Sequence, residues 1–385
     1  MNLELTEEQR MIQETARNFV QTELEPVAAK LDEDGDRNTF MRILRKLAEL
    51  GLNGVNVKTK YGGSEAGKVA LSLVITELGR ACSSTADAVA VTNMVNEVIQ
   101  AIGSEDQKLT YIPKMCSGEY YAGSFALTET VAGSDAAGVR LAAQLDGDEW
   151  ILNGSKKFIT NAQYAGVFVV WALTDKNAPK GKGISIFLVE NGTKGLTIGR
   201  EERKMGQNAI STAELTFEDC RIQKTALMGK LNDGFRTAVA GLAGGRIGIG
   251  SMALGTGLAA MDYATKYAKE RVQFDQPITN FQAIQWMIAE SYTELEAARL
   301  LLMNAAYKAD QGKPFAREAS MAKYYATEAA ERACYNAQQI LGGYGYIKEY
   351  PIERYVRDVR ITSIYEGTNQ IQRLIIARDI LGHLK

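Results

Sequence analysis

The stretch QQILGGYGYIKEYPIERYVRDVRITSIYEGTNQIQ, residues 338–372, combines a paired-glycine break with an isolated acid. A helical pattern ends at Gly342 and Gly343, where the missing side chains permit a close backbone approach to a flat or anionic group, although a plain helix cap explains the pair equally well. Further on, a β-branched and aromatic run breaks at Glu366 and Gly367, and a helix restarts at Thr368. Glu366 is therefore an isolated carboxylate between two elements.

Two interpretations of Glu366 remain open from the residues themselves. Its neighbours Ile361, Ile364 and Tyr365 are apolar or aromatic, and partial desolvation would raise the carboxyl pKa toward that of a working base. Alternatively, the acid flanks the positively polarised N-terminus of the next helix, where the macrodipole favours it.

The pattern outside this stretch predicts helices, then strands, then helices. Apolar positions recur at helical spacing over residues 6–118, and short β-branched runs separated by Gly, Asn and Asp occupy 121–230. There is no regular strand-helix alternation, so a doubly wound sheet is not expected. The later helices are predicted at 232–271, 280–311, 315–341 and 368–381.

The composition indicates an ordinary globular protein of two or three domains. The chain has 385 residues, of which 46% are hydrophobic, and its 44 basic and 46 acidic residues leave a formal charge of −2. This balance argues against a nucleic-acid footprint or a polybasic membrane surface. The four cysteines lack CxxC spacing and His383 is the single histidine, so no metal site is expected. Acid-base chemistry must therefore use carboxylates, Lys or Tyr.

The N-terminal segment predicts an amphipathic helix that is capped by Thr6, rather than a signal peptide. No run of 18 apolar residues is present, so we expect a cytoplasmic protein without membrane insertion.

Two GxGxxA patterns, at 248–253 and 255–260, resemble the fingerprint of nicotinamide enzymes. That fingerprint requires a preceding strand, whereas both patterns lie inside one small-residue helical stretch. We therefore expect close helix packing there, and a strand before Gly248 would favour the nicotinamide alternative.

Three loops could contact a cofactor. The segments FALTETVAGSDAAG, 125–138, and GSKKFITNA, 154–162, could offer backbone N–H groups and hydroxyls to a phosphate or an isoalloxazine edge, or be ordinary polar turns. In KERVQFDQPITNFQAIQ, 269–285, Arg271 could grip a phosphate or form a surface salt bridge.

Together these segments resemble the acyl-CoA dehydrogenase family over essentially the whole chain. LTETVAGSD, 127–135, is similar to the first family signature, residues 338–372 to the second, and GGRIG and KERVQF stand where the family has counterparts. The resemblance implies an α+β fold with an N-terminal helical domain, 1–120, a middle β-barrel-like domain, 121–232, and a C-terminal four-helix bundle, 233–385. It also implies FAD between the last two domains and a homotetramer.

The resemblance carries over cofactor contacts residue by residue. Thr128 would bond the flavin ring, and Phe158 would help to cover it. Arg271 would contact the pyrophosphate and adenine part together with the 339–343 segment of a neighbouring subunit. The implied cofactor-binding residues are Phe125, Leu127, Thr128, Gly133, Ser134, Phe158, Ile159, Thr160, Arg271, Phe274, Gln282, Gln339, Ile340, Gly342, Gly343, Thr368, Asn369 and Gln370.

The resemblance makes Glu366 the catalytic base. It would take the α-proton of an acyl-CoA while the β-hydrogen leaves as hydride to flavin N5, and electrons would pass to electron-transfer flavoprotein. Some relatives carry the base at the position of Gly245, so Glu366 has no rival there, which favours the short- and medium-chain types. The implied substrate contacts are Ser134, Arg246, Tyr365, Gly367 and, as an open question, Asp87.

Asp87 lies in an otherwise apolar helical stretch that lines the acyl end of the pocket in the family. It could be a rim acid that faces water, or a second acid beside a ring-shaped acyl group such as cyclohexanecarboxyl. With Glu366 retained we expect 1,2-elimination. The alternatives are a 1,4-eliminating cyclic enoyl-CoA dehydrogenase that uses Asp87, and an inactive binding protein with this fold. Residues 83–99 contain no arginine, which makes a glutaryl substrate less expected.

Overall fold

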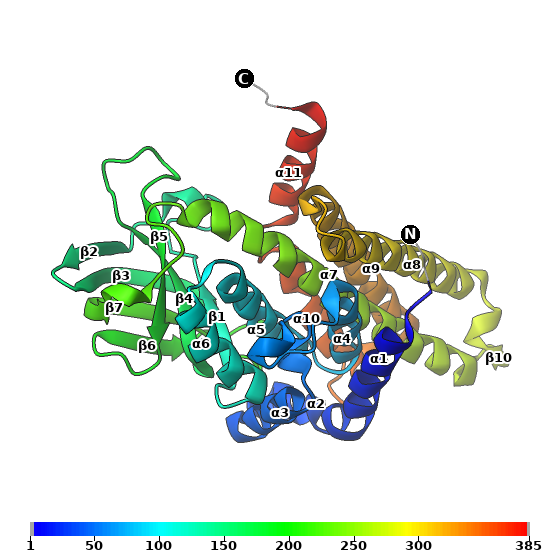
Figure 1. Ribbon diagram of the computed structural model, residues 1–385. Helices are drawn as coiled ribbons and strands as arrows, with labels where there is room; N and C mark the ends of the chain where they lie inside the picture. The colour runs from blue at the N-terminus through cyan, green and yellow to red at the C-terminus, as the bar shows by residue number, and fades with distance from the viewer. Residues whose placement is uncertain (1–3, 383–385) are drawn as a thin grey trace.

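The computed structural model describes residues 4–382, which form a helical N-terminal part, a central sheet and a second helical part (Figure 1). His383 lies outside the described residues. At the start, Thr6 forms the expected capping box with Gln9, since each side chain bonds the backbone N–H of the other residue. The N-terminal elements are α1 (Glu7–Phe19), the π-helical η1 (Val20–Leu24), α2 (Glu25–Asp34), α3 (Arg37–Glu49), η2 (Leu52–Gly54), η3 (Thr59–Tyr61), α4 (Gly67–Ala81), α5 (Ser83–Ile102) and α6 (Glu105–Ser117).

The middle part is an eight-stranded sheet of order β6-β7-β3-β2-β4-β5-β8, with β1 paired in parallel to β4. Most neighbours are antiparallel, and no α-helix lies between one strand and the next within residues 122–228, so the expectation of no doubly wound sheet is confirmed. The strands are β1 (Ala122–Ala126), β2 (Ala142–Asp146), β3 (Glu149–Thr160), β4 (Ala165–Leu173), β5 (Ile184–Glu190), β6 (Leu196–Glu201), β7 (Thr212–Gln223) and β8 (Leu227–Met228), with the short η4 (Ala136–Gly138) and η5 (Lys224–Ala226).

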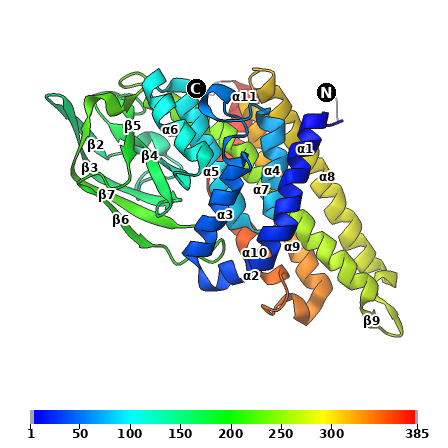
Figure 2. The same ribbon diagram turned by 60° about the horizontal axis from the view of Figure 1, so that its bottom comes forward.

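The C-terminal part is built on α7 (Gly234–Glu270), which extends from the side of the sheet to the far side of the helical part (Figures 1 and 2). Its residues Ile249 and Met252 belong to the same buried apolar cluster as the N-terminal helices, so α7 joins the two helical parts. The other elements are β9 (Val272–Gln273), β10 (Gln276–Pro277), η6 (Ile278–Asn280), α8 (Gln282–Asp310), α9 (Ala316–Leu341), η7 (Gly342–Gly345), α10 (Ile352–Val359), η8 (Arg360–Ser363) and α11 (Asn369–Leu381).

The glycine-rich part of α7 packs tightly against other helices, as predicted. A Cβ at Gly255 would lie 2.1 Å from the carbonyl oxygen of Thr76 on α4, and one at Gly250 would lie 2.7 Å from Cδ2 of Leu302 on α8. Gly248 lies in the interior of α7 and does not follow a strand, so the nicotinamide fingerprint lacks its structural context. By length and composition α7 could cross a membrane, but 78% of its apolar window is buried inside the molecule, as in a core helix.

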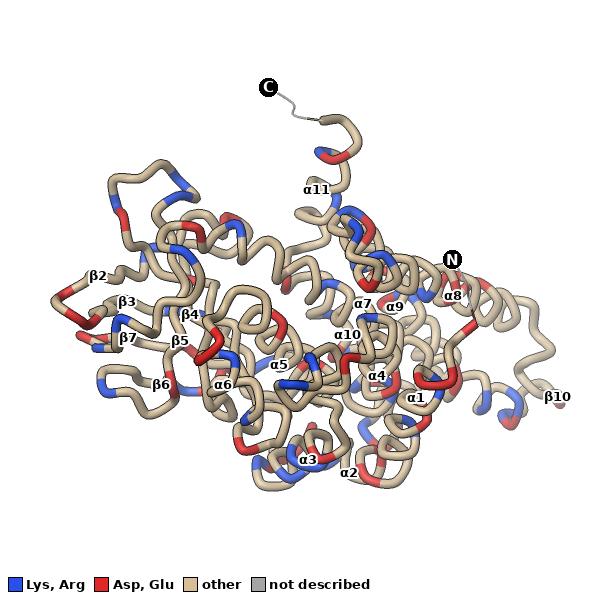
Figure 3. The backbone as a smooth tube through the Cα atoms, viewed as in Figure 1, with Lys and Arg blue, Asp and Glu red and all other residues tan. Residues whose placement is uncertain are grey.

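Acidic and basic residues are interspersed along the backbone (Figure 3), and their numbers nearly balance, with a formal charge of −2.

Candidate active site

Glu366 lies in a tight turn between η8 and α11. Its φ is 49°, and that of Gly367 is 89°, so two consecutive residues adopt left-handed backbone conformations. Such a conformation costs a residue with a side chain on the order of 1 kcal/mol or more, and it persists where surrounding contacts hold it. Gln372 Nε2 donates to the carbonyl of Gly367 at 2.8 Å, and the Thr368 hydroxyl caps α11 by accepting from the N–H of Ile371 at 3.2 Å.

The carboxylate of Glu366 belongs to a partly buried side chain. Its Oε2 is buried and has no hydrogen-bond partner among residues 4–382. Gly245 of α7 provides the space, because a Cβ there would lie 2.3 Å from that oxygen. Burial raises the pKa of Glu366 to about 7, and the positive charges of Lys323, Arg246 and Lys68 oppose this rise. A carboxyl with this pKa can accept or release a proton near neutrality.

All three cations are themselves buried. Arg246 is 4% exposed, donates through Nη1 to Ser320 Oγ at 3.3 Å, and leaves Nε without a partner. Lys68 forms an ion pair with Glu97. Arg246, which the sequence predicts as a substrate contact, acts on Glu366 in the structure, and its contact with substrate stays a prediction. Lys68 and Lys323 were missed, since neither lies in the quoted motifs.

Asp87 lies in the same interior region, on α5. It is only 2% exposed, and its Oδ1 has no partner in the described part of the chain, so the interpretation as a rim acid facing water is wrong. Burial raises the pKa of Asp87 well above its ordinary value, the nearby Glu366 raises it further, and Lys204 opposes both. The neutral form is therefore favoured. The hydroxyl of Tyr365, which accepts from Gln207 Nε2 at 3.4 Å, completes this group.

The two loops with predicted flavin contacts lie side by side. The N–H of Lys157 donates to the carbonyl of Thr128 at 2.8 Å, which joins residues 125–138 to 154–162. Phe125 stacks on Trp171 with ring centroids 4.1 Å apart. Phe158 has φ 58° and is 60% exposed, so a large ring is presented to solvent by a left-handed residue. Such an exposed aromatic is suited to cover a flat ring system.

A buried ion pair that motif analysis missed supports these loops. Lys156, which is fully buried, donates to Glu129 Oε1 at 2.8 Å and to the Leu127 carbonyl at 3.1 Å. The other partners of Glu129 are the backbone N–H groups of Arg140 and Leu141, at 2.7 and 3.0 Å. The alternation of strand β3 could have indicated Lys156, since it falls on the buried face of that strand.

A second group of predicted cofactor residues lines a cavity of about 440 Å³ at the end of α9. The guanidinium carbon of Arg271 lies 5.6 Å from the centre of the Tyr344 ring, and within residues 4–382 it forms no ion pair, which argues against the salt-bridge interpretation. Nothing lies within 4 Å of a Cβ built on Gly342 or Gly343. An unpaired arginine beside two open glycines fits an anionic group such as a pyrophosphate. The full lining is Tyr267, Arg271, Gln273, Ile278, Ile340, Leu341, Gly342, Gly343, Tyr344 and Ile347.

We expected Arg271 to meet the 339–343 segment of a neighbouring subunit. In the structure, Arg271 and residues 340–343 of the same chain line one cavity, so this contact does not require a second subunit. Phe274 and Asp275, with φ 52° and 62°, form the two-residue turn between β9 and β10, and Phe274 is 87% exposed. Such a turn favours glycine, and Asp is among the residues that tolerate it. Gln282 and Gln339 are exposed.

The two groups of cofactor residues lie on different sides of the chain. The β9–β10 hairpin is at one side of the molecule in both ribbon views, and the sheet with β1 and β3 is at the other (Figures 1 and 2). Gly133 and Ser134 are exposed near the sheet, and Gln370 is exposed on α11. The Asn369 side chain is directed inward.

Comparison with known proteins supports one family along the chain. The models "Acyl-CoA dehydrogenase, N-terminal domain", "middle domain" and "C-terminal domain" match residues 6–119, 124–220 and 232–381. The chain is 45% identical to the short-chain specific acyl-CoA dehydrogenase of Bos taurus mitochondria, with 100% of the chain and 91% of the relative covered. It is 44% identical to the acryloyl-CoA reductase (NADH) of Anaerotignum propionicum, with 99% and 96% covered.

A solved structure described as an electron transferring flavoprotein of Acidaminococcus fermentans contains a chain with TM-score 0.97, 40% identity and full coverage of both chains. The open glycines, the unpaired Arg271 and the exposed Phe158 fit the FAD on which this family depends. The chain therefore belongs to the acyl-CoA dehydrogenase family and is an FAD-dependent oxidoreductase that acts on CH–CH bonds.

Proposed function

We propose that this chain dehydrogenates a short-chain or alicyclic acyl-CoA, such as butyryl-CoA or cyclohexanecarboxyl-CoA, to the 2-enoyl-CoA, with Glu366 as the base. The observation that carries the proposal is the buried Oε2 of Glu366, which has no partner within residues 4–382 and faces the space left by Gly245. A buried carboxylate without a partner is costly, and its retention is expected where it reacts with a ligand.

Glu366 acts on the Cα proton of the thioester. Desolvation makes the carboxylate a stronger base than it is in water, and its pKa of about 7 leaves a large ionised fraction near neutral pH. The positive charge of Arg246 lies in the same interior and favours the negative charge that develops on the substrate as the proton leaves. The bound FAD supplies the acceptor for the β-hydrogen, which leaves as hydride.

The same carboxyl can serve either direction of the reaction. Near pH 7 both protonation states of Glu366 are populated, so it can remove a proton from the saturated acyl group or return one to the enoyl group. The relatives of this chain include both a dehydrogenase and a reductase. We propose oxidation with electron-transfer flavoprotein as the electron acceptor, in the cytoplasm.

A homotetramer is part of this proposal. The flavin-ring loops and the Arg271 cavity lie on different sides of one chain, so a dinucleotide that contacts both requires two chains (Figures 1 and 2).

The buried position of Asp87 favours a second candidate function, 1,4-elimination from a cyclic enoyl-CoA. Its Oδ1 has no partner among residues 4–382, and the charge of Glu366 is close enough to raise the pKa of Asp87. We favour 1,2-elimination because Glu366 is present and Asp87 is held in its neutral form, which suits a hydrogen-bond donor better than a base.

A substrate panel tests the proposal. Butyryl-, cyclohexanecarboxyl-, cyclohexenecarboxyl- and glutaryl-CoA are mixed with the yellow holoenzyme, and bleaching of the flavin absorbance is followed for the parent, Glu366→Gln and Asp87→Asn. We expect butyryl- or cyclohexanecarboxyl-CoA to bleach the parent and Asp87→Asn, and Glu366→Gln to stay yellow. Bleaching of Glu366→Gln at the parent rate, or preferential oxidation of glutaryl-CoA, would refute the proposal. Loss of reduction only in Asp87→Asn would favour 1,4-elimination.

A further inference from the structure

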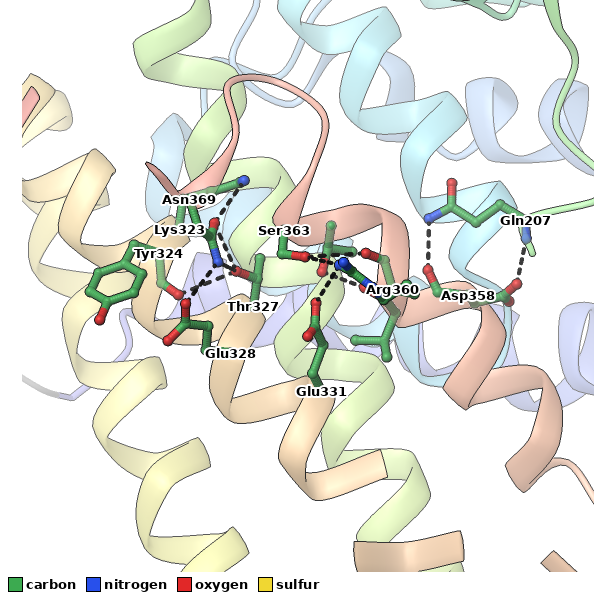
Figure 4. A network of polar contacts seen from close by, with 12 residues as sticks. Gln207, Lys323, Tyr324, Thr327, Glu328, Glu331, Asp358, Arg360, Ser363 and Asn369 are labelled. Atoms are coloured by element: carbon green, nitrogen blue, oxygen red, sulfur yellow. Dashed lines mark hydrogen bonds and ion pairs between the residues drawn. The ribbon is translucent and has the colours of Figure 1, made fainter. Parts of the chain in front are cut away.

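Lys323, in the middle of α9, is a fully buried lysine that the proposed reaction does not use. Lysine is almost never fully buried unless it is paired. Its Nζ donates to the carbonyl of Gly367 at 2.9 Å and to Asn369 Oδ1 at 3.0 Å. Figure 4 shows the Lys323 and Asn369 side chains pointing toward one another, from α9 and from the start of α11. Lys323 thus bonds the chain on the C-terminal side of Glu366.

The hydrogen bonds of Lys323 hold the turn directly after its two left-handed residues. Glu366 and Gly367 both have left-handed backbones, and the Gly367 carbonyl that follows them accepts from Lys323 and from Gln372. Asn369 is in turn held by Thr327, whose hydroxyl accepts from Asn369 Nδ2 at 3.0 Å. The turn is therefore fixed to α9 by buried hydrogen bonds, and one of them is donated by a charged group.

Lys323 has no ion-pair partner among residues 4–382. Two of the acids that act on it, Glu328 and Glu331, form ion pairs with Arg373 at 2.7 Å and with Arg360 at 3.4 Å.

The remaining acid is Glu366, which has the largest influence of the three on Lys323. Arg246 is the cation that opposes the positive charge of Lys323, and Lys68 also favours the ionised form of Glu366. Glu366 in turn raises the pKa of Asp87. The free charges of Lys323 and Glu366 therefore face the same interior.

We propose that Lys323 is a positioning residue for the catalytic turn, which it anchors through Gly367 and Asn369 while its buried positive charge holds the Glu366 carboxylate ready to accept a proton. The inference rests on the proposed function of Glu366 as the base.

The two charges depend on each other. Burial lowers the pKa of Lys323 to about 7 and raises that of Glu366 to about 7, and each group favours the ionised form of the other. In a low-dielectric interior such a pair titrates as a unit. Neutralising Lys323 removes the largest opposition to the rise in the pKa of Glu366, so the base becomes protonated at a higher pH.

Two variants separate the anchor from the charge. Lys323→Gln keeps an N–H donor and removes the charge, whereas Lys323→Met removes both. Arg332→Gln is the matched control, because Arg332 is a cation on the same helix that pairs at the surface with Glu294. Each holoenzyme is reduced by butyryl-CoA, or by the panel's best substrate, across the pH range 5–9. In substrate-free protein, protonation of Glu366 is followed by infrared carboxyl absorption, with Glu366→Gln as the subtraction reference.

We expect the acid limb of the reduction rate, and the infrared titration, to move up by about one pH unit or more in both Lys323 variants and to stay in place in Arg332→Gln. We expect Lys323→Met also to lose bound FAD or thermal stability, while Lys323→Gln retains the flavin.

If Lys323→Gln and the parent give the same infrared titration while Glu366→Gln is inactive, the proposed role of Lys323 is overturned and the proposed base stands. An active Glu366→Gln would overturn the proposed base and this inference with it.

Discussion

Replacement of Glu366 by Gln is expected to abolish flavin reduction and, at the same time, to stabilise the fold. Gln keeps the size of the side chain but has no charge, so the desolvation of a carboxylate disappears. The reaction loses its base, an effect on the order of 10²–10⁴-fold or more in the rate. A gain in stability that accompanies loss of activity is expected of a group kept for function.

The sign of the stability effect follows from the raised pKa. Between about 4.5, its ordinary value, and about 7, the folded state binds the proton of Glu366 more tightly than the unfolded state does. Stability therefore falls as the pH rises through this window. The span corresponds to about 3 kcal/mol at pH 8 and to about 0.8 kcal/mol at pH 5.

The effect can be measured as the apparent Tm of the holoenzyme at a fixed scan rate. For 385 residues that unfold as one unit, an unfolding entropy of about 0.8 kcal/mol/K converts 3 kcal/mol into about 4 °C. We expect Glu366→Gln to exceed the parent by roughly this amount at pH 8 and by about 1 °C or less at pH 5. The exposed Glu49→Gln is the control, for which no such pH-dependent gain is expected. An equal Tm difference at both pH values, or a less stable variant at pH 8, would refute a desolvated carboxylate.

Three further substitutions test the surroundings of the site. Gly245→Ala places a Cβ within 2.3 Å of Glu366 Oε2, so we expect at least a 10-fold loss of flavin reduction with normal FAD content; an unchanged rate would show that the turn can move away. Asp87→Asn removes a desolvated acid, and we expect a higher Tm at pH 8 together with a changed ratio of kcat/KM for cyclic and straight-chain acyl-CoA; an unchanged ratio would place Asp87 outside the acyl pocket. Gly255→Ala forces α7 away from the Thr76 carbonyl, and we expect destabilisation by about 1–3 kcal/mol in denaturant unfolding; a neutral effect would contradict the close packing.

The sequence alone predicted the order and the type of the elements. The helical spacing of apolar residues and the positions of glycines indicated the long helices. The structure has these helices within a few residues of the expected ends, as at Gly234–Glu270 and Ala316–Leu341. These are local properties, because a long periodic pattern has few competing structures. The resemblance of residues 127–135 and 338–372, together with GGRIG and KERVQF, indicated the family, and the comparisons confirmed it. The role of Glu366 stays a proposal.

The surroundings of Glu366 were decided only by the tertiary structure. From the sequence, the base and the helix-end acid were equally consistent readings of this residue. Lys68, Gly245 and Lys323 are far apart in the chain and lie on α4, α7 and α9, yet their packing places them around one carboxylate. Burial and charge pairing depend on such long-range contacts, which no local pattern contains.

Asp87 illustrates the same limit. Its sequence neighbours showed an acid in an apolar helix, but a helix has two faces, and only the packing of α5 shows that this acid faces the interior. The sequence therefore determined which elements form and which family they belong to. The fold determined which charges are removed from water, and that removal gives Glu366, Asp87 and Lys323 their unusual proton affinities.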